Sequence, residues 1–119
     1  MRYPQTEKEL HSALQGQWQV ETEDKTFILS NRVISNVKNA KDSFNNLISN
    51  NIPYSIRWNK GRNRWQIRGN GVFGFDFATI ETMDDNSFTI STSIMTELEY
   101  SRGDDATALK YRTFLRILP

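Results

Sequence analysis

The stretch HSALQGQWQV, residues 11–20, joins a short helical pattern to the start of a β-rich chain. Ahead of Gly16, residues 6–15 read TEKELHSALQ, and their apolar side chains recur at the spacing of one helix face. Thr6 is suited to cap this helix and Gly16 to end it. Trp18 then falls on the strand that follows. The stretch therefore predicts a short helix that leads directly into the first strand.

From residue 17 onward the dominant hydrophobic period is two, with turn residues between the runs. Eight strands are predicted, which is the number at which a small antiparallel barrel closes. We expect an all-β fold: a small antiparallel up-and-down barrel with a short N-terminal helix and a short helix or lid near 40–50. An open, curved sheet or a sandwich is the alternative. The predicted strands are 17–22, 25–30, 32–37, 54–59, 64–69, 72–83, with a bulge near Ala78 or Thr79, then 87–100 and 108–118.

Length and charge limit the function classes. A chain of 119 residues predicts a single domain, 1–119. Fifteen Lys and Arg against fourteen Asp and Glu give a formal net charge of +1, which disfavours general attraction to nucleic acid or membranes. No segment has the roughly 20 apolar residues of a membrane span. We expect a soluble protein, cytoplasmic if Met1 is the native start and otherwise exported with its signal removed. The oligomeric state stays open.

The two ends of the chain together carry a resemblance. Gly16 and Trp18 form a Gly-x-Trp start, and the late stretch LKYRTFLRIL places Arg112 and Arg116 opposite in parity to Tyr111. This arrangement resembles lipocalin-like (calycin) barrels, in which a basic residue of the last strand packs across the Trp of the first. The resemblance implies barrel closure and a non-enzymatic protein that holds a small hydrophobic or aromatic ligand. No cofactor is expected.

In such a barrel, aromatic side chains of one parity would point into the interior. They would either fill the interior as a core or line a pocket for one small apolar ligand. The sequence leaves both alternatives open. The candidate ligand-binding residues are Tyr54, Trp58, Trp65, Phe73, Phe75 and Tyr111.

A second candidate site is the stretch SIRWNKGRNRWQIRGNG, residues 55–71, which contains five cations and no carboxylate. Its alternation predicts a hairpin with a basic outer face and an aromatic inner face. Such a face could bind a protein or nucleic-acid partner; nucleic acid is disfavoured because the rings would lie opposite the cations. A solvated sheet face is the structural alternative. The candidate partner-binding residues are Arg57, Arg62, Arg64 and Arg68.

Catalytic patterns are sparse. His11 is the single histidine and there is no cysteine, so the sequence offers neither a His pair for a metal nor a thiol nucleophile. The glycine-containing run GNGVFGF leads into a predicted strand and not into a helix, unlike a phosphate-binding loop. We therefore expect no metal site and no enzymatic activity.

Overall fold

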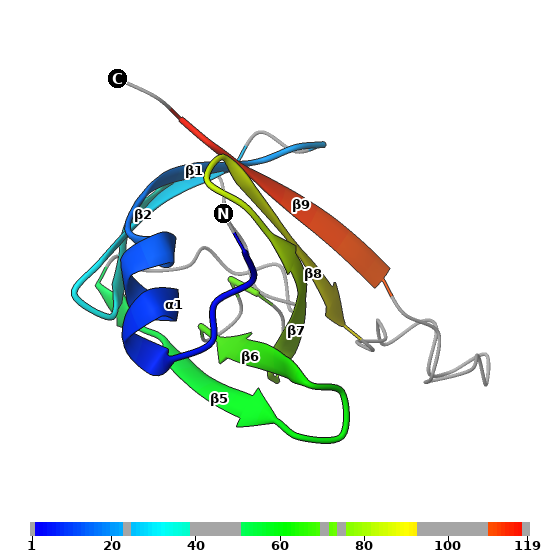
Figure 1. The fold of residues 1–119 in the computed structure, drawn as a ribbon. Coiled ribbons are helices and arrows are strands. Elements are labelled where there is room, and N and C mark those ends of the chain that lie inside the picture. Colours follow the sequence, from blue (N-terminus) through cyan, green and yellow to red (C-terminus); the bar gives the residue numbers. More distant parts are fainter. Residues whose placement is uncertain are drawn as a thin grey trace.

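The part of the chain that the structure describes folds into an antiparallel β-barrel with one short helix at its N-terminal end, as the periodicity predicts (Figure 1). The computed structural model describes residues 2–22, 25–38, 51–69, 72–73, 76–92 and 110–117. Nine strands lie in these ranges, one more than expected. The elements are α1 (Glu7–Leu14), β1 (Gly16–Val20), β2 (Thr26–Ser30), β3 (Val33–Lys38), β4 (Ile52–Pro53), β5 (Ser55–Asn59), β6 (Arg64–Arg68), β7 (Ala78–Met83), β8 (Ser87–Thr92) and β9 (Lys110–Arg116).

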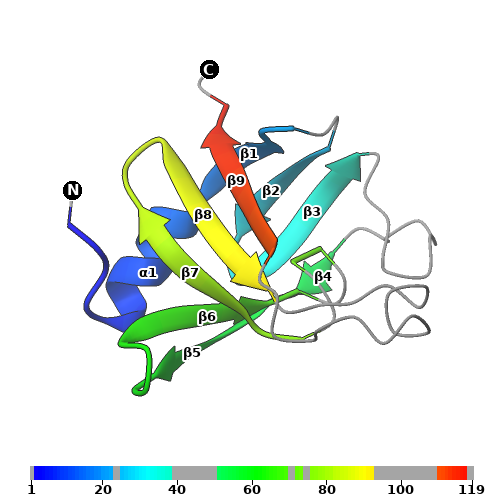
Figure 2. The ribbon, with the colours of Figure 1, turned by 90° about the vertical axis from the view of Figure 1, so that its right-hand side faces the viewer.

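The strands form one sheet in the order β4-β3-β2-β1-β9-β8-β7-β6-β5. The first long strand therefore pairs with the last, with Trp18 opposite Arg116 and Val20 opposite Phe114. Figure 2 shows β7, β8 and β9 side by side, with β1, β2 and β3 continuing the wall. The sheet ends at β4 and β5, which follow each other directly through Tyr54. Because β4 runs into β5 at Tyr54, the two edges of the sheet lie next to each other in sequence and the barrel is nearly closed; the Tyr54 N–H donates to the Arg32 carbonyl at 3.0 Å and extends the pairing of β3 with β4.

The helix forms where the sequence predicts it. Thr6 is the N-cap, and its hydroxyl accepts a hydrogen bond from the Glu9 N–H at 3.1 Å. Leu10 and Leu14 are both fully buried, so the apolar face of α1 packs onto the barrel. The helix ends one residue earlier than expected, with Gln15 as the C-cap.

Gly16 opens β1 in a conformation that few other residues tolerate, because its φ is +132°. A Cβ atom here would also collide with Nη1 of Arg116. That guanidinium lies over the Trp18 ring, 4.3 Å from its centroid, and donates to the carbonyls of Ala13 and Gln15 at 2.9 and 2.6 Å. The expectation that a basic residue of the last strand packs across Trp18 is thus confirmed for Arg116.

Aromatic side chains fill the barrel next to α1. Phe114 lies 4.8 Å from Phe88 in a stacked arrangement, and 5.5 Å from both Phe27 and Phe73 in edge contacts, measured between ring centroids. Trp18 meets the edge of Phe88 at 4.7 Å. All five side chains are at most 1% exposed. This part of the interior is therefore a packed core and not an open lumen.

The inner face of β9 differs from the expected one. The sequence predicts Tyr111 inside because it shares its parity with Leu115, but these two side chains are 61% and 42% exposed. The inner face instead carries Phe114, paired with Phe88, and Arg112, paired with Ile90. The guanidinium of Arg112 lies 5.6 Å from the Phe114 ring and donates to a backbone carbonyl. Bound in this way, an arginine occupies an inner position and reverses the expected alternation.

The predicted strand 72–83 is also shorter than expected. Val72 and Phe73 are buried but lie outside any strand, and β7 begins at Ala78. The irregular register lies between Ile80 and Thr82, two residues beyond the predicted bulge. The predicted helix or lid near 40–50, the strand continuation after residue 92 and Phe75 lie outside the described residues.

Candidate functional site

The basic hairpin of the sequence analysis is formed by β5 and β6. Trp58 pairs with Trp65, and Arg57 with Gln66, so rings and cations alternate between the two faces of the hairpin. Arg64 and Arg68 pair with Asn59 and Ser55 on the same side as Arg57, and Arg62 lies in the turn. We define these four arginines together with Lys60 as the basic hairpin face. Its predicted arrangement, cations outside and rings inside, is confirmed.

Most arginines of this face also make contacts within the protein. The Arg57 guanidinium lies 3.9 Å from the centroid of the Phe77 ring, and its Nε donates to Gln66 at 2.7 Å. Arg62 forms an ion pair with Glu81 at 2.6 Å. Arg64 donates to the Glu81 carbonyl at 3.1 Å. Among the described residues Arg62 is the one cation of this face that forms an ion pair with a carboxylate, so the face keeps a net positive charge.

Most of the candidate ligand-binding residues that the structure describes lie in or against one apolar core. Phe73 belongs to the packed aromatic core, and Tyr111 lies on the outer surface. The ring centroids of Trp65 and half-buried Trp58 lie 5.2 Å apart. Nε1 of Trp65 donates a hydrogen bond to the Pro4 carbonyl at 3.0 Å. Tyr54 is 4% exposed, and its hydroxyl lies 3.1 Å from Nδ1 of His11 on α1. Phe75 lies outside the described residues, and of the other five only Tyr111 lies away from this core.

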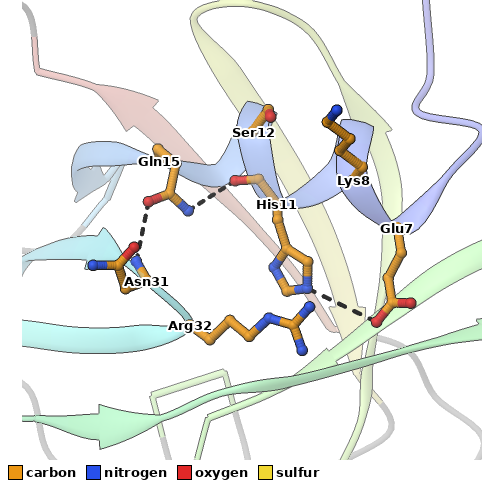
Figure 3. A pocket seen from close by; sticks show the side chains of 7 residues that line it. All are labelled: Glu7, Lys8, His11, Ser12, Gln15, Asn31 and Arg32. Carbon is orange, nitrogen blue, oxygen red and sulfur yellow. Dashed lines mark hydrogen bonds and ion pairs between the residues drawn. The ribbon is translucent and has the colours of Figure 1, made fainter.

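A polar pocket lies elsewhere, between α1 and the β2–β3 turn (Figure 3). Its volume is about 550 Å³. Gln15 joins the two walls, because its side chain donates to the His11 carbonyl at 2.8 Å and accepts from the Asn31 N–H at 3.2 Å. We call this the α1–turn pocket; its lining residues are Glu7, Lys8, His11, Ser12, Gln15, Asn31 and Arg32.

The sequence analysis did not find this pocket. The spacing of Glu7 and His11, four residues apart on one helix, was a signal that they share a face. The approach of Arg32 could not be foreseen, because it depends on the turn at residues 31 and 32. Both turn residues have positive φ values, 50° and 64°. The tertiary contact of this turn with α1 creates the pocket.

His11 is held rigidly at the pocket wall. Its Nδ1 lies 3.1 Å from the Tyr54 hydroxyl, and its Nε2 is buried with no hydrogen-bond partner in the described part of the chain. Burial lowers the pKa of His11 below the usual 6.5, and the nearby Arg32 lowers it further, against a smaller raising effect of Glu7. The ring is therefore neutral near pH 7, and the 4.0 Å approach of Nε2 to the Glu7 carboxylate is too long for a hydrogen bond.

This shift predicts that acid weakens the fold through His11. The unfolded chain takes up the proton at a higher pH than the folded chain does. The stabilisation is therefore complete above pH 6.5 and is lost as the pH falls through the interval below that value. Urea unfolding at several pH values should show this loss, and His11→Gln should remove it. Glu9 and Asp84, whose pKa values are also lowered, titrate below 4.5. An equal loss in His11→Gln would contradict the assignment.

The comparisons with known proteins add no family assignment. No protein-family model matches the chain, and neither curated proteins nor solved structures give a significant match. Among the described residues, no helix is long and apolar enough to cross a membrane. The same ranges contain no cluster of three or more histidine, aspartate or glutamate side chains that could hold a metal ion.

Proposed function

We propose that this chain is a lipocalin-like, non-enzymatic binding domain that docks an acidic protein segment on the basic hairpin face. The observation that carries the proposal is the register of β5 and β6, which puts Arg57, Arg64 and Arg68 on one outer side. The lipocalin-like assignment rests on the nearly closed barrel and on Arg116 stacked over Trp18.

The arrangement of the aromatic rings supports a protein partner over a nucleic acid. Bases stack on rings that lie exposed beside the cations. Here the rings of Trp58 and Trp65 occupy the opposite face of the hairpin, and Phe77 lies under Arg57. The exposed Tyr111 is on β9, four strands away from β5 around the barrel. The basic hairpin face carries positive charge but offers no accessible ring on which a base could stack. It is therefore better suited to bind the carboxylates of a protein segment.

A charge-reversal experiment tests this proposal. Lys60 and Arg68 are exposed, whereas Arg57 and Arg64 also support the fold, so the variant is Lys60→Glu with Arg68→Glu. We expect it to weaken binding of a fluorescent oligo-glutamate peptide at least roughly tenfold, since like charges then face each other. Wild-type affinity should fall as salt rises. Fluorescence anisotropy measures both effects.

The matched control makes the same change of charge outside the hairpin, with Lys8→Glu on α1 and Lys110→Glu on β9, both exposed. It should keep the affinity of the wild-type protein within about twofold. Equal losses in the two variants would overturn the proposed face. Tighter binding of a single-stranded oligonucleotide than of the peptide, at equal salt, would overturn the choice of a protein partner.

A second candidate is the binding of a small hydrophobic ligand by the barrel. It is favoured by Ile56 and Trp58, which belong to the inner face of β5 and are only half-buried, so apolar area there is still accessible. A ligand would gain free energy by covering it. Native mass spectrometry should then show a retained small molecule that is released on denaturation. A mass equal to the chain alone, or to a multiple of it, would count against this candidate.

A further inference from the structure

Strand β5 lies at one end of the sheet, so one long side of its backbone has no partner among the described strands. Its single neighbour in the strand order is β6. Figure 1 shows β5 at the lower border of the barrel. The N–H and C=O groups on the open side of an edge strand can pair with another extended chain. Two hydrogen-bonding contacts of the neighbouring strands identify these groups.

The first contact is that of Tyr3 with β6 and β7. The Trp65 N–H donates to the Tyr3 hydroxyl at 2.7 Å, and this hydroxyl donates to the Ile80 carbonyl of β7 at 2.7 Å. The Trp65 N–H therefore points toward β7 and away from β5. Since Trp65 lies opposite Trp58, these two residues form a non-hydrogen-bonded pair of the hairpin. The N–H and C=O of Trp58 are consequently directed away from β6.

The second contact is the hydrogen bond from the Tyr54 N–H to the Arg32 carbonyl, which directs this N–H toward β3 and not toward β6. Backbone N–H groups alternate in direction along a strand, so those of Ile56 and Trp58 share the direction of Tyr54. Both contacts thus give the same result. The N–H and C=O groups of Ile56 and Trp58 project from the open side of β5, and no hydrogen bond among the described residues occupies them.

The two faces of β5 differ in character. On the inner face, the side chains of Ile56 and Trp58 are only half-buried. On the outer face, Ser55 and Arg57 are exposed. Arg68 lies opposite Ser55 on β6, so a long acidic side chain beside β5 could reach Arg68 over the small serine. A strand added at this edge would therefore need apolar side chains on one face and carboxylates on the other.

We propose that β5 takes up an extended segment of a partner protein as a further antiparallel strand, in which acidic residues alternate with apolar ones. This inference rests on the proposed function, because it assigns the way in which the acidic segment docks on the basic hairpin face. The segment hydrogen-bonds to the backbone of Ile56 and Trp58, and its apolar side chains cover theirs. Its carboxylates lie beside Arg57 and Arg68, which adds charge complementarity to the backbone pairing.

A second copy of this chain suits the same edge less well. If two β5 strands paired antiparallel with Ile56 of one copy opposite Trp58 of the other, Arg57 would lie opposite Arg57. Like charges directly opposite each other destabilise a strand pair. Residues 55–71 contain no carboxylate that could neutralise them. The charge of the edge therefore favours an acidic partner over self-association.

A fluorescent five-residue peptide that alternates glutamate with valine, starting with glutamate, tests strand addition. Its valines would lie opposite Ile56 and Trp58, so the valine N–H groups bond to β5 and the glutamate N–H groups point away. N-methylation of both valines should weaken binding at least roughly tenfold, because the carbonyls of β5 then lose their donors. N-methylation of two glutamates is the matched control and should stay within about threefold. Fluorescence anisotropy measures each affinity. Equal affinities, or a larger loss with methylated glutamates, would overturn strand addition.

Amide hydrogen exchange gives a second readout on the unmodified protein. The amides of Ile56 and Trp58 should exchange at least severalfold more slowly when the unmethylated peptide is saturating. Slower exchange at rising protein concentration without peptide would assign the edge to a second copy and overturn the proposal. Equal binding of the two methylated peptides, lost in Lys60→Glu with Arg68→Glu, would reject strand addition but keep the proposed function. No binding of any acidic peptide would reject both.

Discussion

Replacing Arg116 with methionine should lower the free energy of unfolding by about 3 kcal/mol, a large effect for a half-buried surface position. The guanidinium donates to three backbone carbonyls, those of Ala13, Gln15 and Asp85, at 2.6 to 2.9 Å. It also covers the Trp18 ring. Methionine keeps part of this apolar contact but leaves all three carbonyls without their donor. Chemical denaturation measures the loss.

One further variant separates the effect of the charge over the Trp18 ring from that of the hydrogen bonds to the carbonyls, and a second serves as the control. Arg116→Lys keeps the charge over the ring, but one ammonium cannot reproduce the planar fork, so its loss should be intermediate. Arg68→Met makes the same chemical change at an exposed position of β6 and should stay within about 0.5 kcal/mol of the wild-type protein. A loss in Arg116→Met no larger than that in Arg68→Met would show that Arg116 does not join the helix to the barrel.

Truncation of Phe114 to alanine should cost about 3–5 kcal/mol, the range for large-to-small changes in a packed core. Phe114 is 0% exposed and its ring contacts those of Phe27, Phe73 and Phe88. Its removal would leave a cavity between side chains that come from three separate parts of the chain. Because these side chains are themselves held by the barrel, the cavity cannot fully collapse.

The neighbouring residue supplies the control. Leu115→Ala lies on the outer face of the same strand, where the side chain is 42% exposed, and should cost less than about 1 kcal/mol. Phe114→Leu, which keeps most of the volume, should fall between the two. Equal losses at positions 114 and 115 would contradict the face assignment of β9 and restore the alternation that the sequence suggested.

Local patterns predicted most of the fold. Thr6 caps the helix by a contact within one turn, and the hairpin of β5 and β6 follows from alternation around a turn with Gly61. These features depend on neighbours in sequence. Strand β4 was not predicted. It has only two residues, Ile52 and Pro53, and so short a strand shows no hydrophobic period in the sequence. It exists because β3 provides a partner.

The sites were predicted less completely. The basic hairpin face was foreseen because its cations lie within one hairpin. The α1–turn pocket was missed because Arg32 reaches His11 only when the β2–β3 turn meets the helix. Tyr111 was assigned to the wrong face because parity counts apolar residues as inner ones, whereas Arg112 and Phe114 occupy the inner positions of β9.

By itself, the sequence determined the helix, most strands and which side chains alternate, since these depend on local periodicity and capping. Only the tertiary structure decided which face of β9 points inward, that aromatic rings fill the barrel next to α1, and that a polar pocket forms beside His11. The physical reason is that each of these depends on contacts between distant segments. A half-buried arginine needs carbonyls supplied by another part of the chain, and a packed ring needs neighbours that the barrel brings together.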